Sequence, residues 1–522
     1  MPLWKCLVLR IDDLSESKTG IITSAAYLGS ELEAEFGKIP PSFLPIGHQR
    51  LYQIQYELLR PICDRIVLTL PEGFSLPKWD SDWLASKNVE LIFAPEMSLG
   101  ASVQFAIAAS HACGTLRVLH GDTIFLSALP GDVDLIAVMP GPSRYEWGAV
   151  DDKPRSGRSS VLAGYFSFSS AVEFGRQLTI SRDDFLRAVN EFARQHSSRM
   201  AVLSGWADCG HLQTYYNTRS TISIARSFNA LQSDGLIIKK SSTDIEKMDA
   251  EASWFEQLPP SLRVFTPQYI GREKDGYALS FELSPTLHEL YIFGALQGSA
   301  WGEIFEACST FLEASATCAP LPCAGRLGDA VAEKTKARLE KWFSSSGYDW
   351  DQRFVYAGKK LPPLHFIVDR CVELTNSHEG IPAFVHGDFC FTNTFYDFRY
   401  KRVKVIDPKG AVSGSNNIAD LRYDLAKLRH SLEGYDQILA GRFSLTDGSD
   451  MRIDFHSNGS GIVKEICSDF RVKEKGLYDN DITALTITLF LSMIPLHSDR
   501  PDRQSAFFAN ALRMYSEMED FL

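Results

Sequence analysis

The chain has 522 residues, of which 45% are hydrophobic and 23% charged, and its formal net charge at pH 7 is −12. This length exceeds one ordinary hydrophobic core, so two to four domains are expected, and the near-average composition excludes a fibrous or largely disordered chain. The negative charge argues against a general nucleic-acid-binding protein, although a few local cations and a metal ion can still bind a nucleotide.

Three features of the sequence indicate the cellular compartment of the protein: the N-terminal segment, the cysteines and one apolar stretch. The first residues read MPLWKCLVLRIDDLSES, in which aspartates follow a short apolar run, so no secretory signal is expected. Cys318 and Cys323 lack a second pair, which favours free thiols over structural zinc. Residues 482–496 are too few to span a membrane and predict a buried helix. We therefore expect a cytoplasmic protein without nucleic-acid or membrane partners, and the sequence leaves a homo-oligomer open.

From residue 3 to about residue 222, short strand-like runs alternate with helical stretches. This alternation predicts an α/β domain with a mainly parallel sheet, in which sites gather at the carboxyl ends of strands. The apolar spacing of residues 51–60 and 102–111 suits helices. The expected strands are residues 7–11, 20–24, 65–70, 89–93, 116–119 and 135–139.

The pattern changes near residue 225, where we place the boundary between a domain of residues 1–225 and a domain of residues 226–522. Long amphipathic helices dominate the second domain after its first part. That first part is expected to contain a strand at 236–240, a helix at about 244–257 that two prolines end, and strands at 264–270 and 277–283. Strands with one helix, followed by a helical mass, describe a bilobal, kinase-like α+β domain.

Residues 383–410 read AFVHGDFCFTNTFYDFRYKRVKVIDPKG and contain two acidic turns between apolar runs. Asp388 is followed by Asn393 with the Asp-x4-Asn spacing of a kinase catalytic loop. Asp407 ends a second apolar run and would add a hard oxygen ligand suited to Mg²⁺. Each fragment alone is typical of an ordinary polar turn between strands. Together, and in this order, they indicate phosphoryl transfer to a hydroxyl group.

The motif His386-Gly387-Asp388, with Asn393 and the Ile-Asp turn at Asp407, resembles the signature of the aminoglycoside-phosphotransferase and choline-kinase superfamily, and the resemblance covers the second domain. It implies that Asp388 is the catalytic base, that Asn393 and Asp407 hold Mg²⁺, and that ATP is the phosphoryl donor. His386 would support the loop rather than react.

The same resemblance requires a strand lysine that binds the ATP phosphates and a helix glutamate that holds it. Lys240 and Glu251 occupy a predicted strand and the helix after it. Lys240 is preferred over Lys239 because it shares one face of the strand with Leu236 and Ile238. A solvated lysine pair and a surface position for Glu251 are the alternatives.

Other parts of the second domain also resemble this superfamily. Residues 277–283 and 286–290 resemble the hinge that reads adenine through backbone groups. Asp420 and Asp424, in the segment DLRYDLAK, lie in what resembles a helix that buttresses the catalytic loop, so both are taken as structural. The Ile-Asp-Pro turn resembles members that act on sugars or polyols.

In the first domain, five fragments occur in an order that resembles the sugar-phosphate nucleotidyltransferases. They read IITSAAYLGSEL, PPSFLPIG, SLGASVQFA, LHGDTIF and WADCGHLQTY. The resemblance implies a Rossmann-like (GT-A-like) fold in which Asp122 and Asp208 bind Mg²⁺, Gly29 belongs to the triphosphate-binding turn and Gly100 approaches the base. Carboxylates from two strand ends suit a metal that bridges the α-phosphate and the attacking phosphate.

Tyr27 stands where that family's turn usually carries a glycine, and two further positions depart from the family in their charge. Glu31 stands where the family's turn usually carries a basic residue, and Ser42 stands where it usually carries lysine. Loss of both phosphate contacts would cost transition-state stabilisation. The cations that could compensate are Lys18, Lys38, His48 and Arg50.

The two halves together predict a bifunctional enzyme. The kinase would phosphorylate a sugar, polyol or choline-like metabolite with ATP, and the first domain would couple that phosphate to the nucleoside monophosphate of a second NTP, CTP or another, with release of pyrophosphate. Similar fusions occur in bacterial capsule and surface-polysaccharide pathways. One alternative keeps the kinase and treats the first domain as a non-catalytic nucleotide- or sugar-binding module. The other is an interaction protein built on two inactive enzyme folds.

Overall fold

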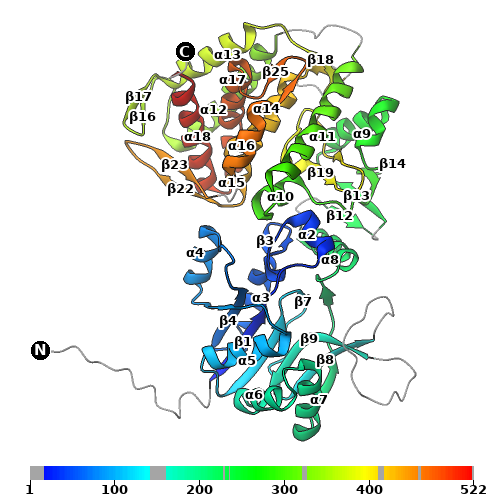
Figure 1. Cartoon of the computed structure of the whole chain (residues 1–522). Helices are drawn as coiled ribbons and strands as arrows, with labels where there is room; N and C mark the ends of the chain where they lie inside the picture. The colour runs from blue at the N-terminus through cyan, green and yellow to red at the C-terminus, as the bar shows by residue number, and fades with distance from the viewer. Residues whose placement is uncertain are drawn as a thin grey trace, which may run out of the picture. The chain divides into compact units, whose positions relative to one another are not determined.

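The computed structural model describes residues 17–140, 160–226, 230–233, 236–319, 326–409, 417–456 and 460–519. The chain divides into two compact units, Met1–Ser223 and Ile224–Leu522, each of which is considered by itself (Figure 1). The predicted domain boundary lies between residues 225 and 226. The predicted strand at 7–11 lies outside the described residues, as does Cys323.

The first unit contains a seven-stranded sheet in the order β10-β8-β9-β6-β1-β4-β5. Four of its strand pairs are parallel, and only β9 runs antiparallel to its neighbours β6 and β8. The prediction of an α/β fold with a mainly parallel sheet is therefore confirmed, whereas β9 was not predicted. The strands are β1 (Lys18–Thr23), β4 (Arg65–Pro71), β5 (Glu90–Ala94), β6 (Thr115–His120), β8 (Leu135–Pro140), β9 (Ser160–Phe168) and β10 (Arg199–Val202).

Helices pack on this sheet through an apolar core. Val67 and Phe166 of the strands belong to the same buried cluster as Val103 and Phe174 of the helices. A short hairpin of β2 (Pro45–Ile46) with β3 (Gln49–Arg50) and an antiparallel ribbon of β7 (Thr123–Phe125) with the distant β11 (Trp206–Asp208) complete the unit. The helices are α2 (Ser30–Phe36), α3 (Leu51–Leu59), α4 (Lys78–Ser86), α5 (Leu99–Ala109), α6 (Ala171–Ile180), α7 (Phe185–His196) and α8 (Leu212–Arg226).

The second unit begins with a four-stranded antiparallel sheet in the order β12-β13-β15-β14, accompanied by α9 (Ile245–Glu256). The predicted strand at 264–270 is wrong in its first part. Residues Pro260–Phe265 form a 3-10 helix instead, because a proline at the first helical position presets the backbone for a helical turn. The strands are β12 (Ala230–Ser233), β13 (Ile237–Ser241), β14 (Tyr269–Glu273) and β15 (Gly276–Ser280).

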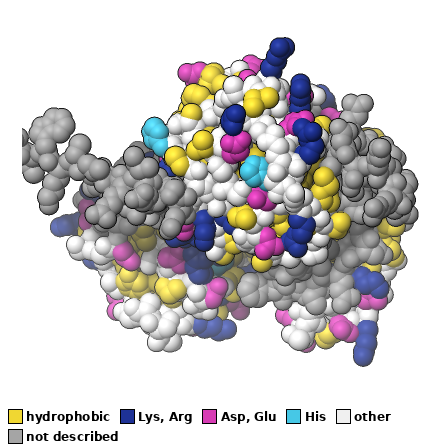
Figure 2. All heavy atoms as spheres, turned by 90° about the horizontal axis from the view of Figure 1, so that it is seen from below, with side chains coloured by type: hydrophobic (Ala, Val, Ile, Leu, Met, Phe, Trp, Pro, Cys, Tyr) yellow, Lys and Arg dark blue, Asp and Glu magenta, His cyan; other side chains and the backbone are white. Residues whose placement is uncertain are grey.

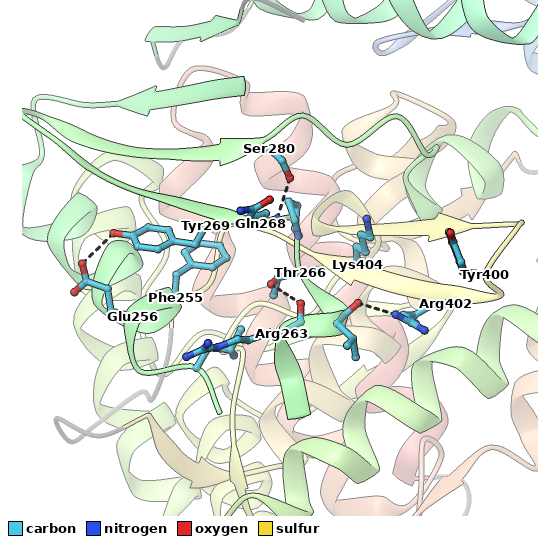
Figure 3. Close-up of a pocket in the computed structure, with 13 residues that line it drawn as sticks. Phe255, Glu256, Arg263, Thr266, Gln268, Tyr269, Ser280, Tyr400, Arg402 and Lys404 are labelled. Atoms are coloured by element: carbon cyan, nitrogen blue, oxygen red, sulfur yellow. Dashed lines mark hydrogen bonds between the residues drawn. The ribbon is translucent and has the colours of Figure 1, made fainter. Parts of the chain in front are cut away.

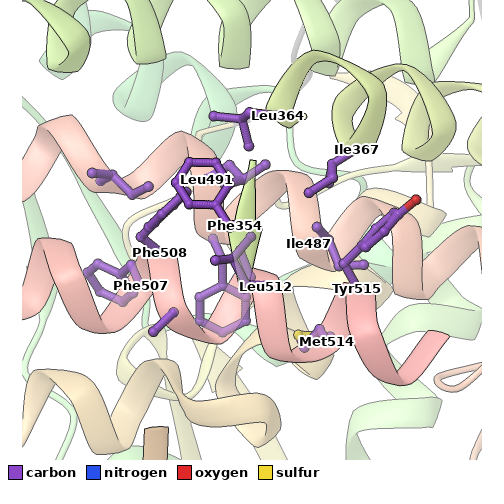
Figure 4. Close-up of a cluster of buried hydrophobic side chains, with 14 of the residues drawn as sticks. Phe354, Leu364, Ile367, Ile487, Leu491, Phe507, Phe508, Leu512, Met514 and Tyr515 are labelled. Atoms are coloured by element: carbon purple, nitrogen blue, oxygen red, sulfur yellow. The ribbon is translucent and has the colours of Figure 1, made fainter. Parts of the chain in front are cut away.

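Helices form most of the remainder of the second unit. Around α17 and α18, side chains from α13 and β16 join one buried cluster that includes Leu364, Ile487 and Phe508 (Figure 4). The predicted buried helix at 482–496 is α17 as far as Met493, after which Pro495 lies in a 3-10 turn. The helices are α10 (Leu287–Phe293), α11 (Gly298–Thr317), α12 (Leu327–Ser346), α13 (Leu364–Asn376), α14 (Arg422–His430), α15 (Asp436–Leu439), α16 (Ser460–Ser468), α17 (Asn480–Met493) and α18 (Pro501–Glu519).

Short two-stranded ribbons connect these helices, and two of them carry the segment of the acidic turns. Strand β18 (Pro382–Phe384) pairs with β21 (Ile418–Asp420), and β19 (Thr394–Asp397) pairs with β20 (Arg402–Val405). The other ribbons are β16 (Phe354–Tyr356) with β17 (Lys359–Leu361), β22 (Phe443–Thr446) with β23 (Arg452–Phe455), and β24 (Arg471–Val472) with β25 (Lys475–Gly476).

The surface, the helices and the thiols add three observations. On the face seen in Figure 2, cationic and anionic side chains are interspersed among hydrophobic ones. Over the described ranges, no helix is both long and apolar enough to cross a membrane. The eight cysteines in those ranges are free thiols.

Candidate functional sites

Lys240 and Glu251 are in direct contact. The Lys240 ammonium lies 2.6 Å from the Glu251 carboxylate and 2.9 Å from the Asp407 carboxylate, and the lysine side chain is only 8% exposed. Burial alone would lower the pKa of Lys240, but Asp407 and Glu251 outweigh it and raise that pKa. Lys239 points to the other face of β13, where it pairs with Glu273 and is 51% exposed. The strand alternation that favoured Lys240 therefore agrees with the contacts.

The His386-Gly387-Asp388 turn follows β18, and its backbone is hydrogen-bonded to Asp424 of α14. Both carboxylate oxygens of Asp424 accept backbone hydrogen bonds, from His386 at 2.7 Å and from Gly387 at 2.8 Å. Gly387 has a φ of 78°, which a residue with a side chain rarely adopts. Burial raises the pKa of Asp424 to about 7 and lowers that of His386 to about 4. Asp424 thus supports the loop through these two bonds, and the His386 ring supports it because its Nδ1 accepts from the backbone N–H of Asp388 at 3.3 Å.

The Asp388 carboxylate contacts three polar side chains. The Asn393 amide nitrogen donates to its carboxylate at 3.2 Å, and the ammonium groups of Lys409 and Lys427 lie 2.5 Å and 2.9 Å from that carboxylate. Burial alone would raise the pKa of Asp388, but Lys427 and Lys409 outweigh it and hold that pKa well below its usual range. The two lysines were not predicted as site residues. Lys427 follows Asp424 by three positions on α14, and that spacing is the signal that could have found it.

Asn393 directly precedes β19 and Asp407 follows β20, so both residues lie at the open end of this hairpin and are neighbours. The backbone N–H of Ile406 donates to the carbonyl of Asn393 at 3.0 Å. Since the Asn393 amide nitrogen donates to Asp388, its amide oxygen is the group left to accept or to ligate. The carboxylate of Asp407 is 40% exposed. These are hard oxygen donors of the kind that Mg²⁺ prefers.

In the described ranges, no group of three or more His, Cys, Asp and Glu side chains has a metal-binding arrangement. Mg²⁺ commonly uses one or two protein carboxylates and takes its other ligands from phosphates and water. The donor set of Asn393 and Asp407 fits that mode.

Asp420, also predicted as structural, is part of a buried ion-pair chain. Its carboxylate lies 2.7 Å from the guanidinium of Arg422, which also lies 3.0 Å from the carboxylate of Asp481 on α17. The predicted hinge strand is shorter than expected, because β15 ends at Ser280, and Thr286 caps α10 through a capping box with Glu289.

The helix that carries Glu251 is anchored by Trp254 to Val385, the residue before the His386-Gly387-Asp388 turn. The indole N–H of Trp254 donates to the carbonyl of Val385 at 2.9 Å, and the Trp254 side chain is 1% exposed. Replacing Trp254 by phenylalanine should leave that carbonyl buried without its partner, and should lower the free energy of unfolding by about 1–3 kcal/mol. Urea denaturation followed by circular dichroism measures this change. Trp342→Phe is the matched control, since the buried Trp342 side chain makes ring contacts but its indole N–H donates no hydrogen bond to any described residue. Equal losses in both variants would refute the role of the bond.

In the first unit, Asp122 and Asp208 lie at adjacent ends of the β7–β11 ribbon. Asp208 is paired with Thr123 across the ribbon, and the backbone N–H of Cys209 donates to the Asp122 carbonyl at 2.7 Å. Burial, together with the Asp208 carboxylate, raises the pKa of Asp122 against the opposing effect of His120. A divalent cation held between the two carboxylates would offset this unfavourable effect on the Asp122 charge.

Asp208 is held in place by its own turn. One carboxylate oxygen accepts from the backbone N–H of Gly210 at 3.1 Å, and the other lies 2.7 Å from Nδ1 of His211 and accepts from the hydroxyl of Thr214. These contacts fix the carboxylate against the turn that leads into α8.

Gly210 lets the Asp122 carboxylate approach the turn. A Cβ atom at position 210 would lie 2.5 Å from the Asp122 carboxylate oxygen, so Gly210→Ala must displace that side chain. If Asp122 holds a metal, a displacement of this size should reduce nucleotidyl transfer by about 10²-fold. Release of pyrophosphate under saturating Mg²⁺ and NTP measures the rate. Gly175→Ala is the control in the same unit, because its Cβ would make only ordinary contacts at 3.9 Å. An unchanged rate in Gly210→Ala would contradict the assignment.

The two glycines predicted to bind nucleotide have different surroundings. Gly29 precedes α2 with extended backbone, and nothing lies within 4 Å of where its Cβ would be. Gly100 lies in the first turn of α5, where a Cβ would come within 2.1 Å of the Asp183 carbonyl oxygen. Gly100 is therefore required for close packing, and its approach to a base stays a prediction.

The two departures in charge from the nucleotidyltransferase pattern are also located. Glu31 is exposed in the first turn of α2. Ser42 is fully buried, and its hydroxyl lies 2.7 Å from the hydroxyl of Ser24, the residue after β1. At the position where the family carries lysine, this chain therefore has a buried serine whose hydroxyl is bonded to another serine hydroxyl.

Four cations were expected to compensate for the missing phosphate contacts, and the positions of two of them, Arg50 and Lys18, argue against that role. Arg50 is buried, pairs with Asp80 at 3.3 Å and donates to the carbonyl of Phe43. Lys18 begins β1, at the opposite end of that strand from the turn. Lys38 is exposed, and its ammonium lies 4.5 Å from the ring centre of Tyr27, a residue of the turn between β1 and α2. His48 lies between β2 and β3.

A separate cavity of about 770 Å³ lies in the second unit beside β14 and β15 (Figure 3). Among its cations, Lys404 pairs with Glu282 at 2.6 Å and Arg402 donates to the carbonyl of Val264. None of the predicted site residues lines this cavity.

No family model and no curated protein matches the chain. Several solved structures do, each over about 40% of the chain. A UDP-glucose pyrophosphorylase complexed with UDP-glucose is 15% identical, with 40% of this chain and 100% of that chain covered and a TM-score of 0.31. The UTP-bound UGPase from Acinetobacter baumannii is 13% identical, with 41% and 95% covered and a TM-score of 0.32. A nucleoside-diphosphate-sugar pyrophosphorylase from Vibrio cholerae is 12% identical, with 38% and 99% covered and a TM-score of 0.30. Likenesses at this level do not assign an activity to either unit.

Proposed function

We propose that residues 226–522 form an ATP-dependent phosphotransferase that phosphorylates a hydroxyl group of a small metabolite. The observation that carries the proposal is the contact of Lys240 with both Glu251 and Asp407, at 2.6 Å and 2.9 Å. A buried cation bound to a helix glutamate and to a metal-ligating aspartate is what an ATP phosphate site needs. The neighbouring contact of Asp388 with Asn393 supplies a group for the acceptor.

In this proposal Lys240 binds the ATP phosphates and Asp388 faces the acceptor. Asn393 and Asp407 would hold Mg²⁺, which neutralises phosphate charge when bound. The acceptor oxygen forms a bond to the γ-phosphorus as the bond to ADP breaks, and the hydroxyl proton leaves. Because Lys409 and Lys427 keep the pKa of Asp388 low, its carboxylate is a weak base. We therefore assign it the orientation of the hydroxyl and late acceptance of the proton, which suits a loose transition state.

We further propose that residues 1–225 transfer a nucleotidyl group from a second NTP, CTP or another, to the phosphorylated product. An oxygen of that phosphate attacks the α-phosphorus, and pyrophosphate leaves. The adjacent carboxylates of Asp122 and Asp208 support this, since they would hold the Mg²⁺ of such a site. The product of one unit is then the substrate of the other. The final compound would be an activated precursor for surface polysaccharide.

A second candidate is that the first unit binds a nucleotide or sugar without catalysis. The burial of Ser42 and the engagement of Arg50 favour it, because both leave the triphosphate turn short of cations. Under this candidate the chain is a kinase alone, and its product carries no nucleotide.

One experiment separates these functions. The purified full chain is incubated with ATP, a second NTP, Mg²⁺ and a panel of sugars, polyols and choline, and products are identified by mass spectrometry. Asp388→Asn should abolish the phosphorylated product, whereas Asp122→Asn should abolish only the nucleotide adduct. A phosphorylated product without any adduct would favour the second candidate. If no nucleotide were consumed by the wild-type chain, both activities would be refuted.

A further inference from the structure

Two ammonium groups contact the carboxylate of Asp388, and they differ in their exposure. The Lys427 ammonium lies 2.9 Å from one carboxylate oxygen, and its side chain, on α14, is only 7% exposed. The Lys409 ammonium lies 2.5 Å from the other oxygen, and its side chain is 53% exposed. Lys427 is therefore an interior partner of Asp388, whereas Lys409 lies on the open side of the same carboxylate.

The backbone fixes Lys409 beside the His386-Gly387-Asp388 turn. The N–H of Lys409 donates to the carbonyl of His386 at 2.9 Å, and Lys409 follows Asp407 by two positions. Among the described residues, the Lys409 side chain has no anionic partner other than Asp388. An ammonium group carries three N–H donors, so two donors of Lys409 remain for a ligand.

The geometry of phosphoryl transfer places the γ-phosphate close to this ammonium. A hydroxyl group that Asp388 orients lies at hydrogen-bond distance from the carboxylate, about 2.7 Å. The phosphorus that the hydroxyl oxygen attacks lies about 3–3.5 Å from that oxygen in a reactive arrangement. Because Lys409 contacts the same carboxylate from its exposed side, its flexible side chain can reach the oxygens of the transferred group. The buried Lys427 is held away from them.

A cation at this place meets an electrostatic requirement of the reaction. The Asp388 carboxylate and the γ-phosphoryl group both carry negative charge, so they repel each other as the acceptor is brought to the phosphorus. The ion pairs of Lys240 are with Glu251 and Asp407, not with Asp388. Lys409 is the exposed cation that contacts Asp388 itself, and it is in a position to offset this repulsion.

We propose that Lys409 is a catalytic residue, which binds the γ-phosphoryl group of ATP during its transfer and offsets the repulsion between that group and the Asp388 carboxylate. The proposal rests on the proposed phosphotransferase function. The acceptor oxygen still forms its bond to the γ-phosphorus, the bond to ADP breaks, and the hydroxyl proton passes to Asp388. Lys409 contributes charge and hydrogen bonds, and it takes part in no proton transfer.

The test compares ATP, which carries a γ-phosphate, with ADP, which does not. Calorimetry with Mg²⁺ and the full-length chain measures the dissociation constant of each nucleotide for the wild type and for Lys409→Gln. The variant should bind ATP about tenfold or more weakly, as loss of one charge-assisted hydrogen bond implies, and should bind ADP within about twofold of the wild type. Its kcat for phosphorylation should fall about 10²-fold, because the cation is also missing from the transition state.

Two variants give the controls. Lys401→Gln removes an ammonium from the turn between β19 and β20 that is 63% exposed and pairs with Glu303, and should change neither the affinities nor kcat. Lys409→Arg keeps the charge and should recover most of the preference for ATP over ADP. In every variant Asp388 retains its contacts with Lys427 and Asn393. A merely structural effect on Asp388 would therefore not separate ATP from ADP.

Acetylation of lysines in the wild-type chain gives a second measurement that needs no variant. ATP with Mg²⁺ should protect Lys409 from the reagent more than ADP does, whereas Lys401 should react equally in all samples, as mass spectrometry of the peptides measures. Equal protection by the two nucleotides, with ATP affinity and kcat unchanged in Lys409→Gln, would overturn the proposal and leave the phosphotransferase standing. If the wild-type chain bound neither nucleotide and phosphorylated no acceptor, the proposed function itself would fall.

Discussion

Replacing Asp388 by asparagine should reduce phosphoryl transfer by about 10²–10⁴-fold, the usual contribution of a positioned proton acceptor. Asparagine keeps the size of the side chain, but it cannot take the hydroxyl proton. Binding of ATP should persist, because the contacts of Lys240 with Glu251 and with Asp407 do not involve Asp388. Steady-state phosphorylation gives the rate, and calorimetry with ATP and Mg²⁺ gives the affinity.

The same substitution carries a structural cost that must be separated from the catalytic one. It leaves the ammonium of Lys427, whose side chain is 7% exposed, without its carboxylate. Breaking one side of a buried ion pair costs about 3–5 kcal/mol of stability. The double variant Asp388→Asn with Lys427→Met removes both partners, and should recover stability without recovering activity. Asp369→Asn, which changes an exposed aspartate, is the control. A folded, ATP-binding Asp388→Asn chain that transfers phosphate at the wild-type rate would refute the role of Asp388.

Replacing Lys240 by methionine should produce the second large effect, a loss of about 10²–10³-fold in kcat/KM for ATP. Methionine retains the apolar stem of the side chain but removes the charge that the phosphates would meet. Among the described residues, the Glu251 carboxylate would then keep the Tyr277 hydroxyl at 2.7 Å and the ammonium of Lys247 at 3.9 Å. Initial rates at varied ATP concentration measure the change.

The chain offers a neighbouring control for this prediction. Lys239→Met removes an ammonium of the same strand that is half exposed and pairs with Glu273 at 2.8 Å. Exposed ion pairs contribute about 0–1 kcal/mol, so this variant should retain both stability and activity. Equal losses in the two variants would show that position on β13 does not matter, and the assignment of Lys240 would fail.

Local patterns in the sequence were sufficient for much of the fold and for the centre of the second site. The predicted strands at 65–70, 116–119 and 135–139 lie within β4, β6 and β8, because β-branched and apolar runs are confined to buried strands there. The spacing from Asp388 to Asn393 and the face shared by Leu236 and Lys240 are also local. They identified side chains that lie in contact in the structure.

Contacts between distant segments could not be predicted in the same way. Trp254 is 131 positions before Val385, and only the tertiary fold brings its indole N–H to the Val385 carbonyl at 2.9 Å. Strand β9 was missed because its antiparallel place between β6 and β8 depends on partners remote in sequence. The 3-10 helix Pro260–Phe265 was missed because an apolar run gave a strand-like pattern, while proline chemistry at its start decided the conformation.

The shared position of Lys240 between two carboxylates has a consequence for how ligands bind. One ammonium neutralises part of the charge of both Glu251 and Asp407. A cation that binds Asp407 weakens the attraction between Asp407 and the Lys240 ammonium. The ammonium then attracts an anion more strongly. An anion drawn to Lys240 in turn leaves Asp407 more attractive to a cation. By thermodynamic reciprocity the two effects are equal, so the metal and the nucleotide should bind with positive cooperativity, each increasing the affinity for the other.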